Sequence, residues 1–203
     1  MLTNFPVKVP YTTGPNMTRN TGPVFNANPD PAIIEQKRQE IHKWGSDLFA
    51  LAHSAFTNRL IERASTYCGF KETNSLLELA YQLEEDIAIM HDGVLSAICF
   101  CFPSSWVPRS RIGFSLMDIH RPVADSATLV KMSQRIAETM ADVNQGSFKR
   151  SVWTISTSGE LSQHPDVKRP PVTDLEHLYF RTETQTTAPL GDGRPSLFFV
   201  KVD

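Results

Sequence analysis

Residues 86–102 have the sequence DIAIMHDGVLSAICFCF, in which two apolar runs of strand-forming side chains flank His91-Asp92-Gly93. An Asp-Gly pair between two such runs is typical of a tight β-hairpin, because the turn needs residues with positive φ. The stretch therefore predicts two antiparallel strands, over 86–90 and 94–102, at the centre of the fold.

Three more strand-forming stretches follow further along the chain, at 148–156 (FKRSVWTIS), 177–186 (HLYFRTETQT) and 195–202 (PSLFFVKV). The last two are joined by the turn-rich connector 188–193. With the hairpin they predict a sheet of five mainly antiparallel strands.

Helical spacing of apolar side chains begins after Asp30-Pro31, a pair suited to a helix cap and a first helical turn. The helical pattern runs to about residue 67, with a break near Gly45. A short helix is predicted from residue 75 to about 83, and a helix over 126–144 crosses between the second and third strands. An α+β fold is the predicted class, with helices on one side or at one end of the sheet.

The length of 203 residues suits one domain, which we expect over 31–203. Residues 1–30 hold five of the fourteen prolines and predict an extended arm that covers the surface or crosses to a second copy in a homodimer.

Charge and hydropathy exclude several partners. The net charge is −2 and no run of five or more like charges occurs, so no nucleic-acid partner is expected. No apolar stretch approaches the ~20 residues of a membrane span, and no secretory signal precedes the fold, so we expect a cytoplasmic protein without a membrane partner.

The segment 103–123 is long for a connection between elements, and such connections are often functional. It contains Trp106, Arg109, Arg111 and His120. Together these side chains offer a stacking surface, partners for carboxylates and an imidazole for a metal, as a flat anionic cofactor would need. Alternatively, His120 is an ordinary loop residue.

Cys99 and Cys101 lie one residue apart in the apolar hairpin strand and would point to the same face. They are expected to be small buried side chains, with ligation of a heme iron by a thiolate as the alternative.

Several motifs in the order found here resemble the heme-dependent oxidative N-demethylase family, the relatives of dimethylamine monooxygenase. The first motifs are Glu85-Asp86, CFPSSWVP at 101–108, Gly113 and IHRPV at 119–123. Further on, Arg150-Ser151-Val152-Trp153 is similar to the family's Arg-x-Asn-Trp element, and Arg181–Thr186 resembles its Arg-Val-Glu-Arg-Gln-Thr strand. The resemblance covers about residues 75–202.

This resemblance implies a PAS-like fold that holds heme b. It also implies an O2-dependent reaction that removes a methyl group from a small amine as formaldehyde. The electrons would come from NADPH through a separate reductase, because no GxGxxG nicotinamide motif follows a strand in this chain.

The resemblance also implies roles for single residues. His120 would ligate the iron. Arg150 and Arg181 would bind the heme propionates, and Trp106 and Trp153 would form walls of the site. Glu85, Asp86 and Glu183 are candidate catalytic carboxylates that could receive the amine or hold the proximal histidine. For each of these residues a role in the core, in a solvated helix end or in a cross-strand pair is the alternative.

Two departures from the family pattern keep other functions open. Val152 stands where the family has Asn, and Thr184 stands where it has a second Arg. A heme-binding sensor or carrier without turnover is therefore one alternative. A protein that binds another small hydrophobic molecule in the same pocket is the other.

Overall fold

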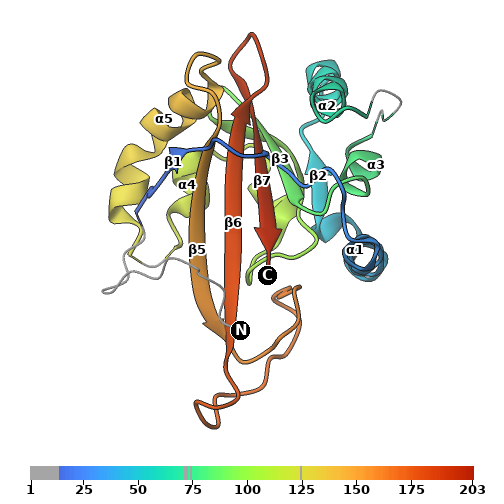
Figure 1. Cartoon of the computed structure of the whole chain (residues 1–203), viewed down its shortest axis with the longest axis vertical. Helices are drawn as coiled ribbons and strands as arrows, with labels where there is room; N and C mark the ends of the chain where they lie inside the picture. The colour runs from blue at the N-terminus through green and yellow to red at the C-terminus, as the bar shows by residue number, and fades with distance from the viewer. Residues whose placement is uncertain (1–13, 71–72, 74, 124) are drawn as a thin grey trace.

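The fold is given by a computed structural model that describes residues 14–70, 73, 75–123 and 125–203. A seven-stranded sheet forms its centre, and all neighbouring strands in it are antiparallel (Figure 1). In the order β1-β5-β6-β7-β3-β4-β2, the strands are β1 (Thr18–Arg19), β5 (Phe148–Ser156), β6 (Tyr179–Pro189), β7 (Pro195–Val202), β3 (Asp86–His91), β4 (Val94–Cys99) and β2 (Phe49–Leu51). The α+β class is confirmed, whereas a PAS-like topology stays a prediction.

The central hairpin forms as its sequence predicts. Asp92 and Gly93 have φ angles of 49° and 74° between β3 and β4, which is the backbone that a tight two-residue turn needs. β4 ends at Cys99 instead of Phe102. The reason is that the backbone N–H groups of Cys101 and Phe102 donate to the Asp86 carboxylate instead of to a neighbouring strand.

The predicted count of five strands is wrong, because two short strands extend the sheet at its edges. β1 comes from the N-terminal arm and pairs with the first residues of β5. β2 lies inside the stretch that was expected to be helical and pairs with β4, with Phe49 opposite Cys99. Residues 1–13 of the predicted arm lie outside the described residues.

The first helix, α1 (Pro31–Trp44), begins as predicted, with the Asp30 carboxylate accepting from the N–H of Ala32 at 2.8 Å. It ends at Gly45, where φ is 54°. The other helices are α2 (Ala55–Tyr67), α3 (Leu76–Ala80), α4 (Leu116–His120) and α5 (Ala127–Ala141), with 3₁₀ turns η1 (Gly45–Asp47) and η2 (Pro108–Arg111). The segment 103–123, which was expected as a long connection between elements, contains η2 and α4.

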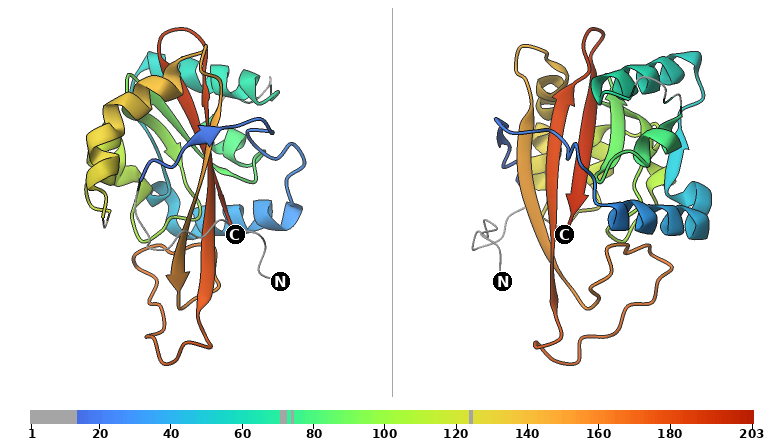
Figure 2. Two further views of the ribbon diagram at one scale, coloured as in Figure 1. Left: turned by 60° about the vertical axis from the view of Figure 1, so that its left-hand side comes forward. Right: turned by 45° about the vertical axis from the view of Figure 1, so that its right-hand side comes forward.

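The two faces of the sheet have different coverings (Figures 1 and 2). On one face, α5 packs against β6 and β7. The N-terminal segment crosses the other face, where the Thr186 hydroxyl donates to the Val24 carbonyl and the Phe25 ring lies 5.6 Å from the ring of Phe199. Successive side chains of a strand point to opposite faces, so Phe198, next to Phe199, faces α5.

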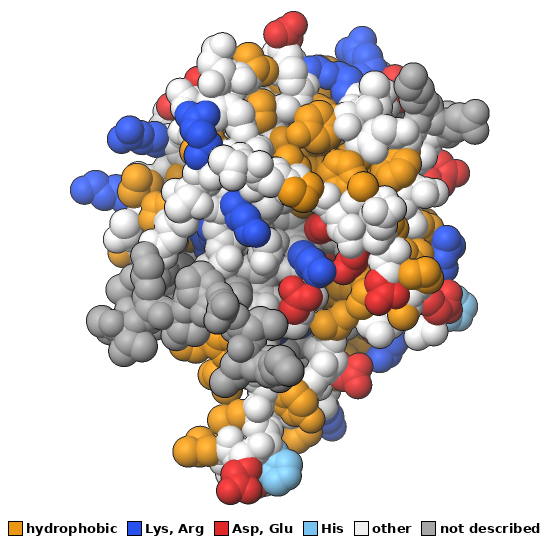
Figure 3. All heavy atoms as spheres, in the orientation of Figure 1, with side chains coloured by type: hydrophobic (Ala, Val, Ile, Leu, Met, Phe, Trp, Pro, Cys, Tyr) orange, Lys and Arg blue, Asp and Glu red, His pale blue; other side chains and the backbone are white. Residues whose placement is uncertain are grey.

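The outer surface carries charges of both signs, as Figure 3 shows for one face, in keeping with the net charge of −2. Among the described residues, no helix is both long and apolar enough to cross a membrane. Localisation in the cytoplasm stays a prediction.

Candidate functional site

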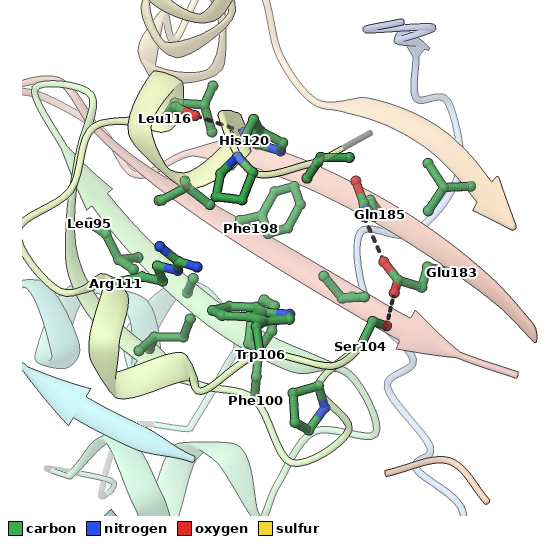
Figure 4. Close-up of a pocket in the computed structure, with 18 of the residues that line it drawn as sticks. Leu95, Phe100, Ser104, Trp106, Arg111, Leu116, His120, Glu183, Gln185 and Phe198 are labelled. Atoms are coloured by element: carbon green, nitrogen blue, oxygen red, sulfur yellow. Dashed lines mark hydrogen bonds between the residues drawn. The ribbon is translucent and has the colours of Figure 1, made fainter. Parts of the chain in front are cut away.

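A cavity of about 470 Å³ lies between the sheet and the segment 102–123. Its volume is within the range of roughly 300–1,000 Å³ that small-molecule and cofactor pockets occupy. Most of its wall is apolar (Figure 4), with Met90, Leu95, Phe100, Trp106 and Phe198 among the lining residues. The sheet and the segment 102–123, which carries the FPSSW and IHRPV motifs, therefore enclose one pocket.

His120 lines this cavity from the last residue of α4. The Ser115 hydroxyl caps the helix by accepting from the N–H of Asp118 at 3.2 Å, which fixes the short helix in place. Nδ1 of His120 lies 2.8 Å from the Leu116 carbonyl oxygen, as the dashed line in Figure 4 marks. Because a carbonyl only accepts, Nδ1 must carry a proton, and in the neutral ring Nε2 therefore keeps the lone pair.

The surroundings of His120 also favour its neutral form. Burial lowers the pKa of the imidazole and the nearby Arg150 lowers it further, while the bond to Leu116 acts in the opposite direction. A neutral imidazole with one nitrogen held by a backbone carbonyl is the form in which histidine ligates a metal.

Two arginine side chains line the cavity. Arg150, on β5, was predicted for this place. Arg111, at the end of η2, was expected only as one of two possible carboxylate partners in the segment 103–123, together with Arg109. Its backbone is fixed beside β4, since the N–H of Gly113 donates to the Leu95 carbonyl and the N–H of Leu95 to the Phe114 carbonyl, both at 2.9 Å.

Arg181 does not line the cavity, in contrast to the role predicted for it. Its guanidinium donates to the carbonyls of Leu161 and Phe102 and, at 3.3 Å, to the Ser104 hydroxyl. It is 5% exposed and lies behind the turn that forms the cavity wall. Among the residues that the structure describes, Arg111 and Arg150 are therefore the two arginine or lysine side chains in the cavity lining.

Of the three predicted carboxylates, Glu183 lines the cavity. The Ser104 hydroxyl donates to its Oε1 at 2.6 Å and the Gln185 amide donates to its Oε2 at 2.8 Å (Figure 4). Each oxygen of a carboxylate can accept a second bond, so Glu183 keeps acceptor capacity toward a ligand. Sequence reasoning missed Ser104 and Gln185, although both stand inside the two motifs that carry the resemblance.

Glu85 and Asp86 are buried outside the cavity lining. Glu85 accepts from the backbone N–H of Asn26 at 2.9 Å, and burial raises the pKa of its carboxyl. Burial also raises the pKa of Asp86, against the effect of Lys37 at 3.7 Å and of two backbone N–H donors. Neither carboxylate is placed to receive a ligand in the cavity.

Both predicted tryptophans, Trp106 and Trp153, line the cavity. The Trp106 ring meets the Phe100 ring edge to face, with 5.6 Å between the ring centroids. Trp106 adds flat apolar surface to the wall. Trp153 stands opposite Thr182 on β6, and its ring lies 5.4 Å from the ring of Phe180, on the face of the sheet opposite to Glu183. The ring of Trp153 therefore does not face the cavity, in contrast to the role expected for it.

The alternative of a thiolate ligand does not fit this cavity. Phe100 and Phe102 line the cavity, whereas Cys99 and Cys101 do not, because alternate side chains point to opposite sides. Both thiols are 0% exposed. Burial raises the pKa of Cys101 well above its usual value, and the adjacent Cys99 raises it further. Cys99 and Cys101 are buried hydrophobic residues, the first of the two readings.

The lining fits a heme better than a bare metal ion. In the part of the chain that the structure describes, no three His, Cys, Asp or Glu side chains gather as metal ligands. A heme iron needs only an axial ligand from the protein, and His120 offers one. Apolar walls suit the porphyrin, and two guanidinium groups suit its two propionates.

Comparison with known proteins agrees with this geometry. A family model described as "Haem-dependent oxidative N-demethylase, alpha subunit-like" matches residues 40–202, which extends the similarity toward the N-terminus beyond residue 75. No protein of curated function matches the sequence. The matched range covers most of the chain, from the end of α1 to the last strand. The chain therefore belongs to the haem-dependent oxidative N-demethylase, alpha subunit-like family.

Proposed function

We propose that this protein binds heme b in the cavity with His120 as the iron ligand and catalyses the O2-dependent N-demethylation of a small amine. The observation that carries the proposal is the state of His120. Its ring lines an apolar cavity, its Nδ1 is held by the Leu116 carbonyl, and its neutral form is favoured.

Side chains that line the cavity would hold the cofactor. Arg111 and Arg150 would bind the propionates by charge-assisted hydrogen bonds, and Trp106 would pack on the porphyrin. When bound, the heme supplies an iron at which O2 can be bound and reduced.

In the proposed reaction, the amine's N–CH3 bond is replaced by N–H and the methyl carbon leaves as formaldehyde. One oxygen atom of O2 enters formaldehyde and the other enters water. The two electrons come from NADPH, which is oxidised to NADP⁺ on a separate reductase, and one further proton is taken up.

Glu183 would receive the substrate. An alkylammonium group would donate its N–H to the carboxylate, which Ser104 and Gln185 hold in place through its other lone pairs. The apolar side chains around it, such as Phe198 and Val152, would exclude water and contact the alkyl groups. The apolar side chains of the cavity would thus hold the methyl group in position while Glu183 binds the ammonium charge.

The test is reconstitution of the purified protein with hemin, followed by an absorption spectrum and an assay for formaldehyde. We expect a Soret band. With dimethylamine, O2, NADPH and an added reductase we expect one formaldehyde per NADPH oxidised. If no Soret band appears, the heme proposal fails and a different hydrophobic ligand becomes the alternative.

A second candidate is a heme-binding sensor or carrier without turnover. The observation that favours it is the position of Val152, which stands where the family has Asn and lines the cavity itself. A Soret band with reversible O2 binding, and no formaldehyde from a panel of methylamines, would support this candidate against the enzyme.

The two arginines give a prediction about affinity. Arg111→Leu and Arg150→Leu should each weaken heme binding by roughly 10- to 100-fold, since hydrogen bonds to charged groups contribute about 1.5–3 kcal/mol. Binding of heme dimethyl ester, whose propionates carry no charge, should change by less than about threefold. The measurement is a Soret titration of each protein with each cofactor.

The matched control is Arg109→Leu. Arg109 stands two residues from Arg111 but contacts Asp47 at 3.5 Å and the Ser46 hydroxyl at 3.0 Å, away from the cavity lining. The Arg109→Leu protein should bind heme and heme dimethyl ester as the unaltered protein does. Equal losses for heme and its ester in the Arg111 and Arg150 variants would mean that packing, not charge, was removed.

A further inference from the structure

Asp86 accepts hydrogen bonds from the backbone where the cavity wall begins. Its Oδ1 accepts from the N–H of Cys101 and its Oδ2 from the N–H of Phe102, both at 2.9 Å. The carboxylate is 1% exposed and lies 3.7 Å from the ammonium of Lys37, which is itself 0% exposed. That ammonium also donates to the carbonyls of Leu83 and Glu85, at 2.9 Å and 2.6 Å.

Arg181 holds the same stretch of backbone from its other side. Its Nη2 donates to the Phe102 carbonyl at 2.9 Å, so this one residue is bonded at its N–H by a carboxylate and at its C=O by a guanidinium. Nη1 of Arg181 reaches the Leu161 carbonyl, and Nε lies 3.3 Å from the Ser104 hydroxyl.

The Ser104 hydroxyl connects Arg181 to the cavity. A guanidinium N–H can only donate and a carboxylate can only accept. Ser104 must therefore accept from Arg181 and donate its single hydrogen to Glu183, over the 2.6 Å contact seen in Figure 4. The direction of each bond from Arg181 to the cavity carboxylate is thereby fixed.

The turn that carries Ser104 needs such support. Ser105 has a φ of 67°, in the left-handed region that costs a residue with a side chain roughly 1–2 kcal/mol. Gln163 binds the turn as well, since its N–H donates to the Pro103 carbonyl at 3.0 Å and its carbonyl accepts from Ser105 at 2.9 Å. Bonds from distant parts of the chain thus maintain a backbone shape that the turn would not favour alone.

We propose that Asp86 and Arg181 are positioning residues that fix the 101–105 turn and, through Ser104, set the orientation of Glu183 in the cavity. This assigns them a role other than the catalytic and propionate-binding ones that their motifs suggest. Only the identity of the ligand that Glu183 receives rests on the proposed function.

The test compares Asp86→Asn, Arg181→Lys and Ser104→Ala with the control Arg63→Lys. Arg63 also donates to two backbone carbonyls, of Leu190 and Asp192, but lies outside the cavity lining. Asparagine offers one acceptor oxygen in place of two. In Asp86→Asn, amide hydrogen exchange at Cys101 or Phe102 should therefore accelerate by about tenfold, as loss of one buried hydrogen bond implies.

The orientation of Glu183 is read from crystal structures and from ligand preference. In Arg181→Lys and Ser104→Ala the contact of 2.6 Å between Ser104 and Glu183 should be lost and the carboxylate displaced. In heme-loaded protein these variants should bind dimethylammonium at least about fivefold more weakly, with dimethyl ether, its neutral analogue, unaffected. If the replaced residue had a purely structural role, its variant would bind dimethylammonium and dimethyl ether with equal losses of affinity.

The proposal is overturned if Arg181→Lys keeps the Ser104–Glu183 contact, or if Arg63→Lys displaces Glu183 as much as Arg181→Lys does. The exchange and crystallographic measurements need no heme. A protein without a Soret band would thus refute the proposed function and leave the positioning of Glu183 to be judged separately. Ser104→Ala removes one hydroxyl and keeps the test available if a buried-charge variant fails to fold.

Discussion

Protein in which His120 is replaced by alanine should show no Soret band after reconstitution with hemin. His120 is the imidazole of the cavity lining, and its protonated Nδ1 is held by Leu116, so Nε2 is the nitrogen that can bind iron. Loss of a hydrogen-bond partner of a metal-bound histidine already costs 10–100-fold in metal affinity, and loss of the ligand itself should cost at least about 100-fold. The measurement is a spectral titration with hemin.

Two further variants separate ligation from folding. His177→Ala should keep a normal band, because His177 is exposed, contacts Asp174 at 2.7 Å and does not line the cavity. His120→Gly should regain a band when imidazole is added, as a free imidazole can occupy the space of the missing ring. A normal band in His120→Ala would place the ligand elsewhere and refute this assignment.

The parts of the fold that depend on local sequence were predictable. The hairpin of β3 and β4 follows from Asp92-Gly93, and α1 follows from its Asp30 cap, because both signals act within a few residues. β1 and β2 could not be predicted. They have two and three residues, and they are strands because their backbones meet the edges of β5 and β4, which lie far away in the sequence.

The residues of the candidate site divide in the same way, into those that the local sequence predicts and those that depend on contacts with distant parts of the chain. His120 and Trp106 follow from one contiguous segment, so their motif was enough to place both in the cavity. Arg181, Glu183 and Gln185 alternate along β6 and would share one face. Glu183 and Gln185 line the cavity, whereas Arg181 lies beneath the turn of residues 102–104, a position set by the fold of a segment almost eighty residues away.

Asp86 differs from its expected role for a comparable reason. It shares a sheet face with Ala88 and Met90, which line the cavity, and would therefore be read as a site residue from its strand alone. The backbone of Cys101 and Phe102 passes over the end of β3 and takes both carboxylate oxygens. The path of that backbone depends on tertiary packing, which no local pattern in the sequence specifies.

Replacing Glu183 with glutamine should leave heme binding intact and weaken the binding of dimethylammonium by roughly 10- to 100-fold, the usual effect of losing a hydrogen bond to a charged group. Glutamine keeps the size of the side chain but loses the charge, and its amide N–H₂ would take the place of an oxygen that accepts from either the Gln185 amide or the Ser104 hydroxyl. The catalytic efficiency, kcat/KM for formaldehyde release, should fall at least as far. Dimethyl ether should bind equally well to both proteins, because it carries no charge.

Glu160→Gln is the matched control, since Glu160 is an exposed carboxylate outside the cavity lining. It should bind dimethylammonium as the unaltered protein does, which would show that the loss in Glu183→Gln is not a general effect of removing one negative charge. An unchanged affinity for dimethylammonium in Glu183→Gln would exclude this carboxylate as the amine-binding group. Equal losses for the ammonium and for the ether would instead mean that the substitution changes the shape of the cavity. The difference between the two probes therefore decides whether the charge of Glu183 selects a cationic substrate.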